Sequence, residues 1–183
     1  MFKEYYDSFL LDPPVIMGLQ MLPLTLGHTV LLESIDCPFY TATKKEVTNQ
    51  DLIISAIICS KPWQEVKKMI TSKDESLIND ALEWGKNADC NWAEASRMFT
   101  QYLIDYIQGP EYWKTSGENK KLSWQHVVAW CLQHYGGYTK EQAWNEPVCD
   151  ALWNYAAIGM INGGGENLVG ESDREMQEAL SNG

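Results

Sequence analysis

The chain has 183 residues, 45% of them hydrophobic and 21% charged, and its 14 basic and 25 acidic residues leave a net charge of −11. This length and composition are typical of one folded domain and exclude a disordered chain. Nucleic acids and anionic membranes bind clustered Lys and Arg. The acidic charge therefore argues against both as partners.

The five cysteines form no CxxC pair and are odd in number. Cys59, Cys131 and Cys149 lie among apolar neighbours, which favours reduced, buried thiols in the cytoplasm over a disulfide framework. Acidic residues at positions 4 and 7 are unlike a signal peptide. The longest apolar run, residues 52–59, is far shorter than the ~20 residues of a membrane helix. We expect a soluble cytoplasmic protein.

Helix signals begin at the N-terminus, where apolar residues at helical spacing predict a helix over residues 2–10. Thr25 is the expected N-cap of a second helix, which ends at Pro38. Residues 48–51 resemble a capping box ahead of residues 52–60. The β-branched content of that segment also fits a buried strand, but the cap favours a helix.

Pro62 is expected in the first turn of the next helix, with Ser60 as its cap. A clear capping box at residues 72–75 predicts a further helix. Residues 91–94 open the strongest helix, which ends at residues 109–110. Its apolar face is expected to hold Trp92, Ala95, Phe99, Tyr102, Leu103 and Tyr106.

Helix signals continue in the second part of the chain, after a polar loop. Ser123 is the expected cap of a helix, and a capping box at residues 139–142 predicts a short one. Pro147 starts another helix, and a short acidic helix is expected at residues 172–180. The buried stripe of the Ser123 helix is predicted to contain Trp124, Val127, Val128, Cys131, Leu132 and Tyr135. That of the Pro147 helix is predicted to contain Val148, Ala151, Leu152, Tyr155 and Gly159.

The predicted fold class is all-α, because no alternating strand pattern with turn dipeptides is present. We expect a compact bundle of about eight or nine helices that forms a single domain over residues 1–183. Alternatively, two helical lobes, residues 1–108 and 123–183, are joined by a loop at residues 109–122.

No residue pattern indicates catalysis. His126 and His134 are ~12 Å apart along one helix, too far to share a metal, and the three histidines, with His28, are expected on helix surfaces. Cys131 and His134 are spaced as two metal ligands on one helix could be, but no second ligand pair is visible. A core role is therefore favoured for the Cys131 thiol. Neither a GxSxG elbow nor a phosphate-binding glycine loop is present. We expect a protein that is not an enzyme and has no catalytic residues, metal or cofactor.

The aromatic content is high, with eight Trp and nine Tyr. Six of these rings fall on predicted core faces: Trp92, Trp124, Tyr102, Tyr106, Tyr135 and Tyr155. Four tryptophans lie at helix starts, in the loop or off the main apolar stripe, and because exposed aromatic side chains often anchor protein interfaces, they are candidate partner-binding residues: Trp63, Trp113, Trp130 and Trp153. Residues 141–183 carry eight acidic residues and one basic residue, which indicates either a solvated flank or a docking surface for a basic partner.

Three segments carry a resemblance to a known family. Residues 23–28 (PLTLGH) lead into a Leu-rich helix that ends at Pro38 and Phe39, and residues 52–63 (LIISAIICSKPW) form an apolar helix that ends in Cys-Ser-x-Pro-Trp. Residues 138–147 (YTKEQAWNEP) run from a capped turn through Trp into a proline-initiated helix. In this order the segments resemble a group of prophage proteins named tail assembly chaperones. A small-and-aromatic face (Ala151, Tyr155, Ala156) and residues 165–168 (GENL) follow in the same order.

The resemblance implies a mostly helical, non-enzymatic chaperone in the cytoplasm of the bacterial host. Such proteins are thought to cover the tape measure protein of a phage tail until tail tube protein replaces them, which makes these two proteins the expected partners, with self-association as a further option. Nucleic acid and membrane are not expected. Two alternatives remain open: a structural tail or head–tail component of the virion, and an enzyme or small-ligand-binding protein.

Overall fold

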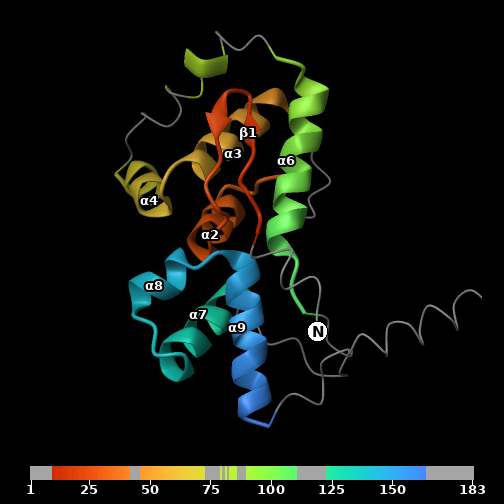
Figure 1. Cartoon of the computed structure of the whole chain (residues 1–183). Helices are drawn as coiled ribbons and strands as arrows, with labels where there is room; N and C mark the ends of the chain where they lie inside the picture. The colour runs from red at the N-terminus through yellow and green to blue at the C-terminus, as the bar shows by residue number, and fades with distance from the viewer. Residues whose placement is uncertain are drawn as a thin grey trace, which may run out of the picture.

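The computed structural model describes residues 10–41, 46–72, 79, 81, 83–85, 90–110 and 123–163 of the chain. This part of the protein is mainly helical, so the all-α prediction is confirmed. The first half contributes α2 (Leu26–Ser34), α3 (Asn49–Ser60), α4 (Trp63–Thr71) and α6 (Trp92–Ile107), and the second half contributes α7 (Trp124–Tyr135), α8 (Lys140–Asn145) and α9 (Val148–Ile161) (Figure 1). The predicted helices at residues 2–10 and 172–180, the capping box at 72–75 and most of the 109–122 loop lie outside the described residues. Within the described residues, no helix is both long and apolar enough to cross a membrane.

The helix starts follow the predicted caps. In each case the side-chain oxygen of the cap accepts a hydrogen bond from the backbone N–H three residues later, which satisfies a donor that the helix leaves unpaired. The segment after Thr48 is helical and not a strand, as its cap predicts. The confirmed caps are Thr25, Thr48, Asn91, Ser123 and Thr139.

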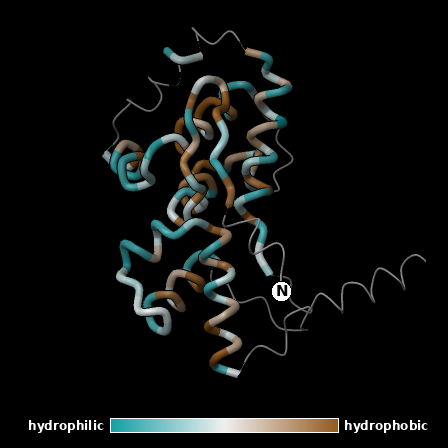
Figure 2. Tube along the Cα trace, viewed as in Figure 1, coloured by the Kyte–Doolittle hydropathy of each residue, from teal (hydrophilic) through white to brown (hydrophobic). Residues whose placement is uncertain are grey.

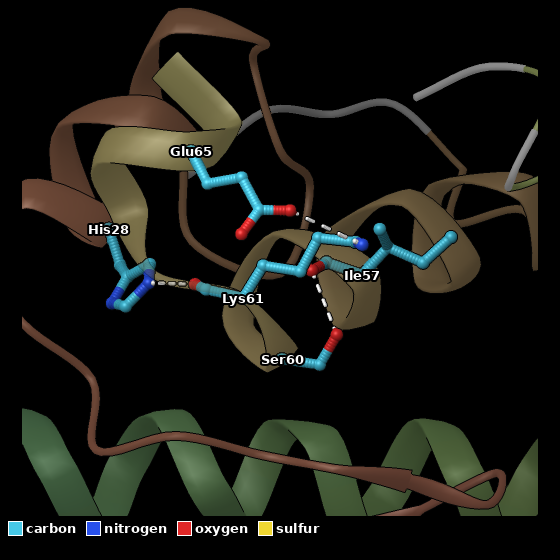
Figure 3. Close-up of polar contacts among 5 residues, drawn as sticks. All are labelled: His28, Ile57, Ser60, Lys61 and Glu65. Atoms are coloured by element: carbon cyan, nitrogen blue, oxygen red, sulfur yellow. Dashed lines mark hydrogen bonds and ion pairs between the residues drawn. The ribbon is translucent and has the colours of Figure 1, made fainter. Parts of the chain in front are cut away.

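One predicted cap is wrong. Ser60 does not cap α4, because it is the last residue of α3 and its hydroxyl donates to the carbonyl of Ile57 at 2.9 Å (Figure 3). Pro62 occupies the cap position instead, without a side-chain cap. Its ring needs no N–H partner there, so the chain turns from α3 into α4 within two residues.

A small hairpin precedes α2, and the sequence patterns above do not predict it. Strands β1 (Val15–Ile16) and β2 (Leu19–Gln20) pair antiparallel around Met17 and Gly18, which both have positive φ values of 53° and 79°. Two positive φ angles are typical of the two-residue turns that match strand twist. The hairpin lies against α3 and α6 and buries Ile16 fully.

The core runs through both halves of the chain. Buried apolar side chains of α2, α3 and α6 and of α7 and α9 form one continuous cluster. Phe99, Tyr102 and Tyr106 of α6 lie inside it, as predicted, while Trp92 is only half-buried. Hydrophobic residues concentrate along α2, α3 and the hairpin, whereas α4 and α8 are more hydrophilic (Figure 2).

The predicted buried face of α7 is wrong in part. Trp124 is exposed and Tyr135 is 59% exposed, while Gln125 and Ala129 are buried. The helix can bury Gln125 because its Nε2 donates to Glu33 Oε2 (3.0 Å) and to the hydroxyl of Tyr40 (3.1 Å). These long-range partners turn α7 away from its most apolar stripe.

The predicted face of α9 is also displaced. Val148 and Ala151 are buried as predicted, but Leu152, Tyr155 and Gly159 are only half-buried. The buried positions include Cys149, Trp153 and Ala156. Helix α9 packs against α6 and α7 at once, so it buries a wider arc than one stripe.

An antiparallel bridge joins the starts of α2 and α9. The N–H of Val148 donates to the carbonyl of Leu24 at 2.8 Å, and the N–H of Leu26 donates to the carbonyl of Glu146 at 3.2 Å. Residues 24–26 and 146–148 are thereby held side by side. The bridge brings α8, which ends at residue 145, against α2.

His28 is a core residue, so the expectation of a surface histidine is wrong. Its side chain is 1% exposed. Nε2 lies 2.8 Å from the carbonyl oxygen of Lys61 (Figure 3). Nδ1 lies 3.2 Å from the backbone nitrogen of Thr25. These partners require a neutral ring with its proton on Nε2, and burial lowers the pKa of His28. The bond to Lys61 ties α2 to the turn that starts α4.

We expect the His28→Gln variant to be less stable at pH 7.5 by about 1–3 kcal/mol, because glutamine keeps the cap on Thr25 but leaves the Lys61 carbonyl without its donor. The difference should shrink as the pH falls below about 6.5. The unfolded histidine then binds a proton, whereas the buried ring, with its lowered pKa, stays neutral to lower pH. Urea unfolding of both proteins between pH 7.5 and 5 measures this, and a pH-independent difference would contradict the assignment.

Candidate functional site

A groove of about 510 Å³ opens between α2, α4, α7 and α8. These helices come from distant parts of the chain, and α4 and α8 both border the left side of the molecule in Figure 1. The apolar and aromatic walls are formed by Val30, Leu31, Trp63, Ile70 and Trp144. Gly27, Ser34, Thr71, Lys67, Lys140 and His126 complete the lining.

Trp63 is seated in this groove by a glycine. A Cβ atom added to Gly27 would lie 2.3 Å from Cδ2 of the Trp63 indole, far inside contact distance. The indole therefore lies directly on the backbone of α2, a position that only glycine permits. Gly27 thus allows α4 to approach α2 closely enough to form the floor of the groove.

The polar edge of Trp63 is satisfied within the protein. Its Nε1–H donates to Asn145 Oδ1 at 2.8 Å, and Gln64 Nε2 donates to the same oxygen at 2.7 Å. Asn145 is the last residue of α8, so these two bonds hold α4 to α8. The face of the indole, and not its N–H, is what the groove offers to a ligand.

Two further rings complete an aromatic cluster. The Trp144 ring lies 6.4 Å from that of Trp63, and the His126 ring packs edge-on against Trp144 at 5.1 Å. Lys67 Nζ lies 5.5 Å from the centre of the Trp63 ring, within the range of a cation–π contact. The groove therefore combines apolar ring faces with positive charge.

The four tryptophans predicted to bind a partner are not brought together. Trp63 lines the groove, and Trp113 lies outside the described residues. Trp130 is 50% exposed on α7, stacked on His134 at 4.0 Å and outside the groove lining. Trp153 is only 9% exposed and belongs to the interior, because α9 turns it inward. Of the three described residues, two thus present ring surface to solvent.

A second, polar hollow of about 450 Å³ lies beside α8 and includes Tyr138 and Glu146. Tyr138 Oη donates to Glu146 Oε1 at 3.1 Å, and Asn154 Nδ2 donates to both oxygens at 3.2 Å. Burial raises the pKa of Glu146 despite these bonds. The three groups bind one another and link α8 to α9, which is the arrangement of a structural network.

The cysteines are free thiols, and those with a shifted pKa are held in the neutral form. Burial raises the pKa of Cys149 to about 11 and also raises the pKa of Cys59 and Cys131. His134 Nδ1 bonds the carbonyl of Trp130 at 2.9 Å, and its ring stacks on the Trp130 indole. Among the described residues, no cluster of three or more His, Cys, Asp or Glu could hold a metal ion.

No protein-family model, curated protein or solved structure matches the chain.

Of the residues that line the groove, the sequence predicts only Trp63 as a binding residue. Trp144 is predicted as part of the capped turn before Pro147, and His126 as a surface histidine, but neither is predicted to meet Trp63. The signal that was available is Gly27, a glycine in the first turn of a helix, because such a glycine often marks a close approach.

We expect Gly27→Ala to lower the free energy of unfolding by about 1–3 kcal/mol, because the new methyl group displaces the Trp63 indole. The matched control is Gly159→Ala in α9, where a Cβ meets nothing within 4 Å. There alanine should stabilise the helix by roughly 0.5–1 kcal/mol. Urea unfolding and Trp fluorescence measure both variants. Equal stabilisation by the two substitutions would show that Trp63 is not seated on Gly27.

Proposed function

We propose that the protein is a non-enzymatic tail assembly chaperone that binds the tape measure protein during phage tail morphogenesis. The groove between α2, α4, α7 and α8 is its binding site. An isolated amphipathic helix exposes an apolar stripe that promotes aggregation, and a partner groove can cover this stripe reversibly. The proposal concerns binding alone, and no bond is made or broken.

One observation carries the proposal. The three segments that resemble the tail assembly chaperones converge on the groove, although they are far apart in the sequence. Residues 23–28 contribute Gly27, residues 52–63 end at Trp63, and residues 138–147 contribute Trp144. Residues from three separate segments thus meet at one surface feature, which is what a shared binding site requires.

The chemistry of the groove supports binding over catalysis. Its walls are mostly apolar, and its aromatic faces suit the i, i+3, i+4 and i+7 side chains of a helix. Modest affinity at each groove is sufficient when many copies bind along one long helical rod. The net charge of −11 helps to keep a densely covered rod in solution.

The test is co-expression with the tape measure protein that the proposal expects a neighbouring gene to encode. We expect the tape measure protein to become soluble and to co-purify with this chain. Tape measure protein that stays insoluble and unbound would contradict the proposal. Mass spectrometry of purified phage particles then distinguishes a chaperone from a structural tail component, because a chaperone is absent from the virion and a tail component is retained.

Within that complex, we expect Trp144→Ala to weaken binding about thirtyfold, which is the usual effect of removing a central aromatic anchor. Trp144 is chosen over Trp63, because the Trp63 side chain also bonds Asn145 and supports the fold. The matched control is Trp130→Ala, which removes an exposed indole outside the groove and should bind within about twofold of the wild type.

Circular dichroism should show the same helix content for both tryptophan variants. If Trp130→Ala abolishes binding while Trp144→Ala does not, the partner lies on the exposed face of α7 and the assignment of the groove is wrong.

A further inference from the structure

The groove carries positive charge on a protein that is otherwise acidic. The described residues include five basic and twelve acidic side chains. Two of the five basic side chains, Lys67 and Lys140, line the groove, and none of the twelve acidic ones does. The charge of the groove is thus opposite in sign to that of the chain as a whole.

The two lysines belong to different walls of the site. Lys67 lies in the middle of α4, and Lys140 is the first residue of α8. Both are exposed, and among the described residues neither has an acidic side chain within 4 Å. The ion pair drawn in Figure 3 joins Lys61 and Glu65. Their ammonium groups remain available to a partner.

Lys67 is also oriented for this purpose. Its ammonium group lies 5.5 Å from the centre of the Trp63 ring, so the side chain is directed along the aromatic wall and not away from it. A carboxylate that approaches the rim beside an apolar anchor on Trp63 would meet this ammonium group. An apolar contact and a charge contact are therefore offered side by side.

We infer that the groove selects an amphipathic helix whose apolar anchors are flanked by Asp or Glu side chains, which pair with Lys67 and Lys140. This inference rests on the proposed helix-binding function and adds the charge of the partner to it. Apolar anchors supply most of the affinity, while the two lysines set orientation and exclude basic helices, because a like charge at the rim is unfavourable.

The net charge of the chain opposes this preference for an acidic helix. At long range a chain of −11 attracts basic helices and repels acidic ones. A preference for an acidic helix must therefore arise from short-range contacts in the groove. The interpretation of residues 141–183 as a docking surface for a basic partner predicts the opposite preference.

The experiment compares two synthetic helical peptides with the same Leu anchors at i, i+3, i+4 and i+7. One peptide has Glu at the flanking positions, and the other has Lys. Isothermal titration calorimetry with the full chain should show the Glu peptide binding about tenfold more tightly at 50 mM salt, with a smaller difference at 500 mM.

Charge-reversal variants locate the effect. Lys67→Glu and Lys140→Glu should each weaken the Glu peptide by about three- to tenfold and strengthen the Lys peptide. The matched control is Lys68→Glu, which makes the same change in net charge at the neighbouring exposed position of α4 outside the groove lining. It should change neither affinity by more than about twofold.

The outcomes separate the two proposals. If both peptides bind equally, or the Lys peptide binds more tightly, the charge inference is overturned while helix binding stands. An effect of Lys68→Glu equal to that of Lys67→Glu also overturns it, because net charge alone would then explain the preference. If neither peptide binds and the tape measure protein stays unbound, both proposals fail. A dimer that excludes the peptides would assign the groove to a second copy of the chain and overturn the inference.

Discussion

The contact between the Trp63 indole and the backbone at Gly27 is the constraint on which the groove depends. It sets how closely α4 approaches α2, and the bond from Trp63 Nε1 to Asn145 then sets where α8 lies. A larger residue at position 27 would move the indole and separate all three helices. The same glycine lies in the first turn of α2, where it costs stability relative to alanine, so the close approach compensates for a local disadvantage.

Position and charge in the groove are supplied by different parts of the structure. His28 bonds the carbonyl of Lys61 and thereby fixes the turn into α4, but it does not line the groove itself. Lys67 and Lys140 line the groove but take no part in these supporting bonds. We therefore expect a change in the charge of the rim to leave the fold intact, which allows the site to be tested without unfolding the protein.

Local signals predicted the helices well, because a cap and the helix after it depend on neighbouring residues. Thr48 and Asn91 are examples, and both start helices where the sequence places them. The buried faces were predicted less well. Gln125 is inside because its side chain finds Glu33 and Tyr40, which are about 90 residues earlier in the chain. The hairpin at Met17 was missed because its turn depends on two φ values that composition barely constrains.

The candidate site was beyond sequence reasoning for the same reason. Each of its rings is ordinary on its own helix, and only the packing of α4 against α2 and α8 brings Trp63 to Trp144. The polar edge of Trp63 is already hydrogen-bonded to Asn145 within the protein. The proposed partner would gain contact with the ring faces without having to replace a hydrogen bond, which favours reversible binding. That property suits a surface that covers a helix for a limited time, whereas a permanent structural joint would gain from additional directional bonds.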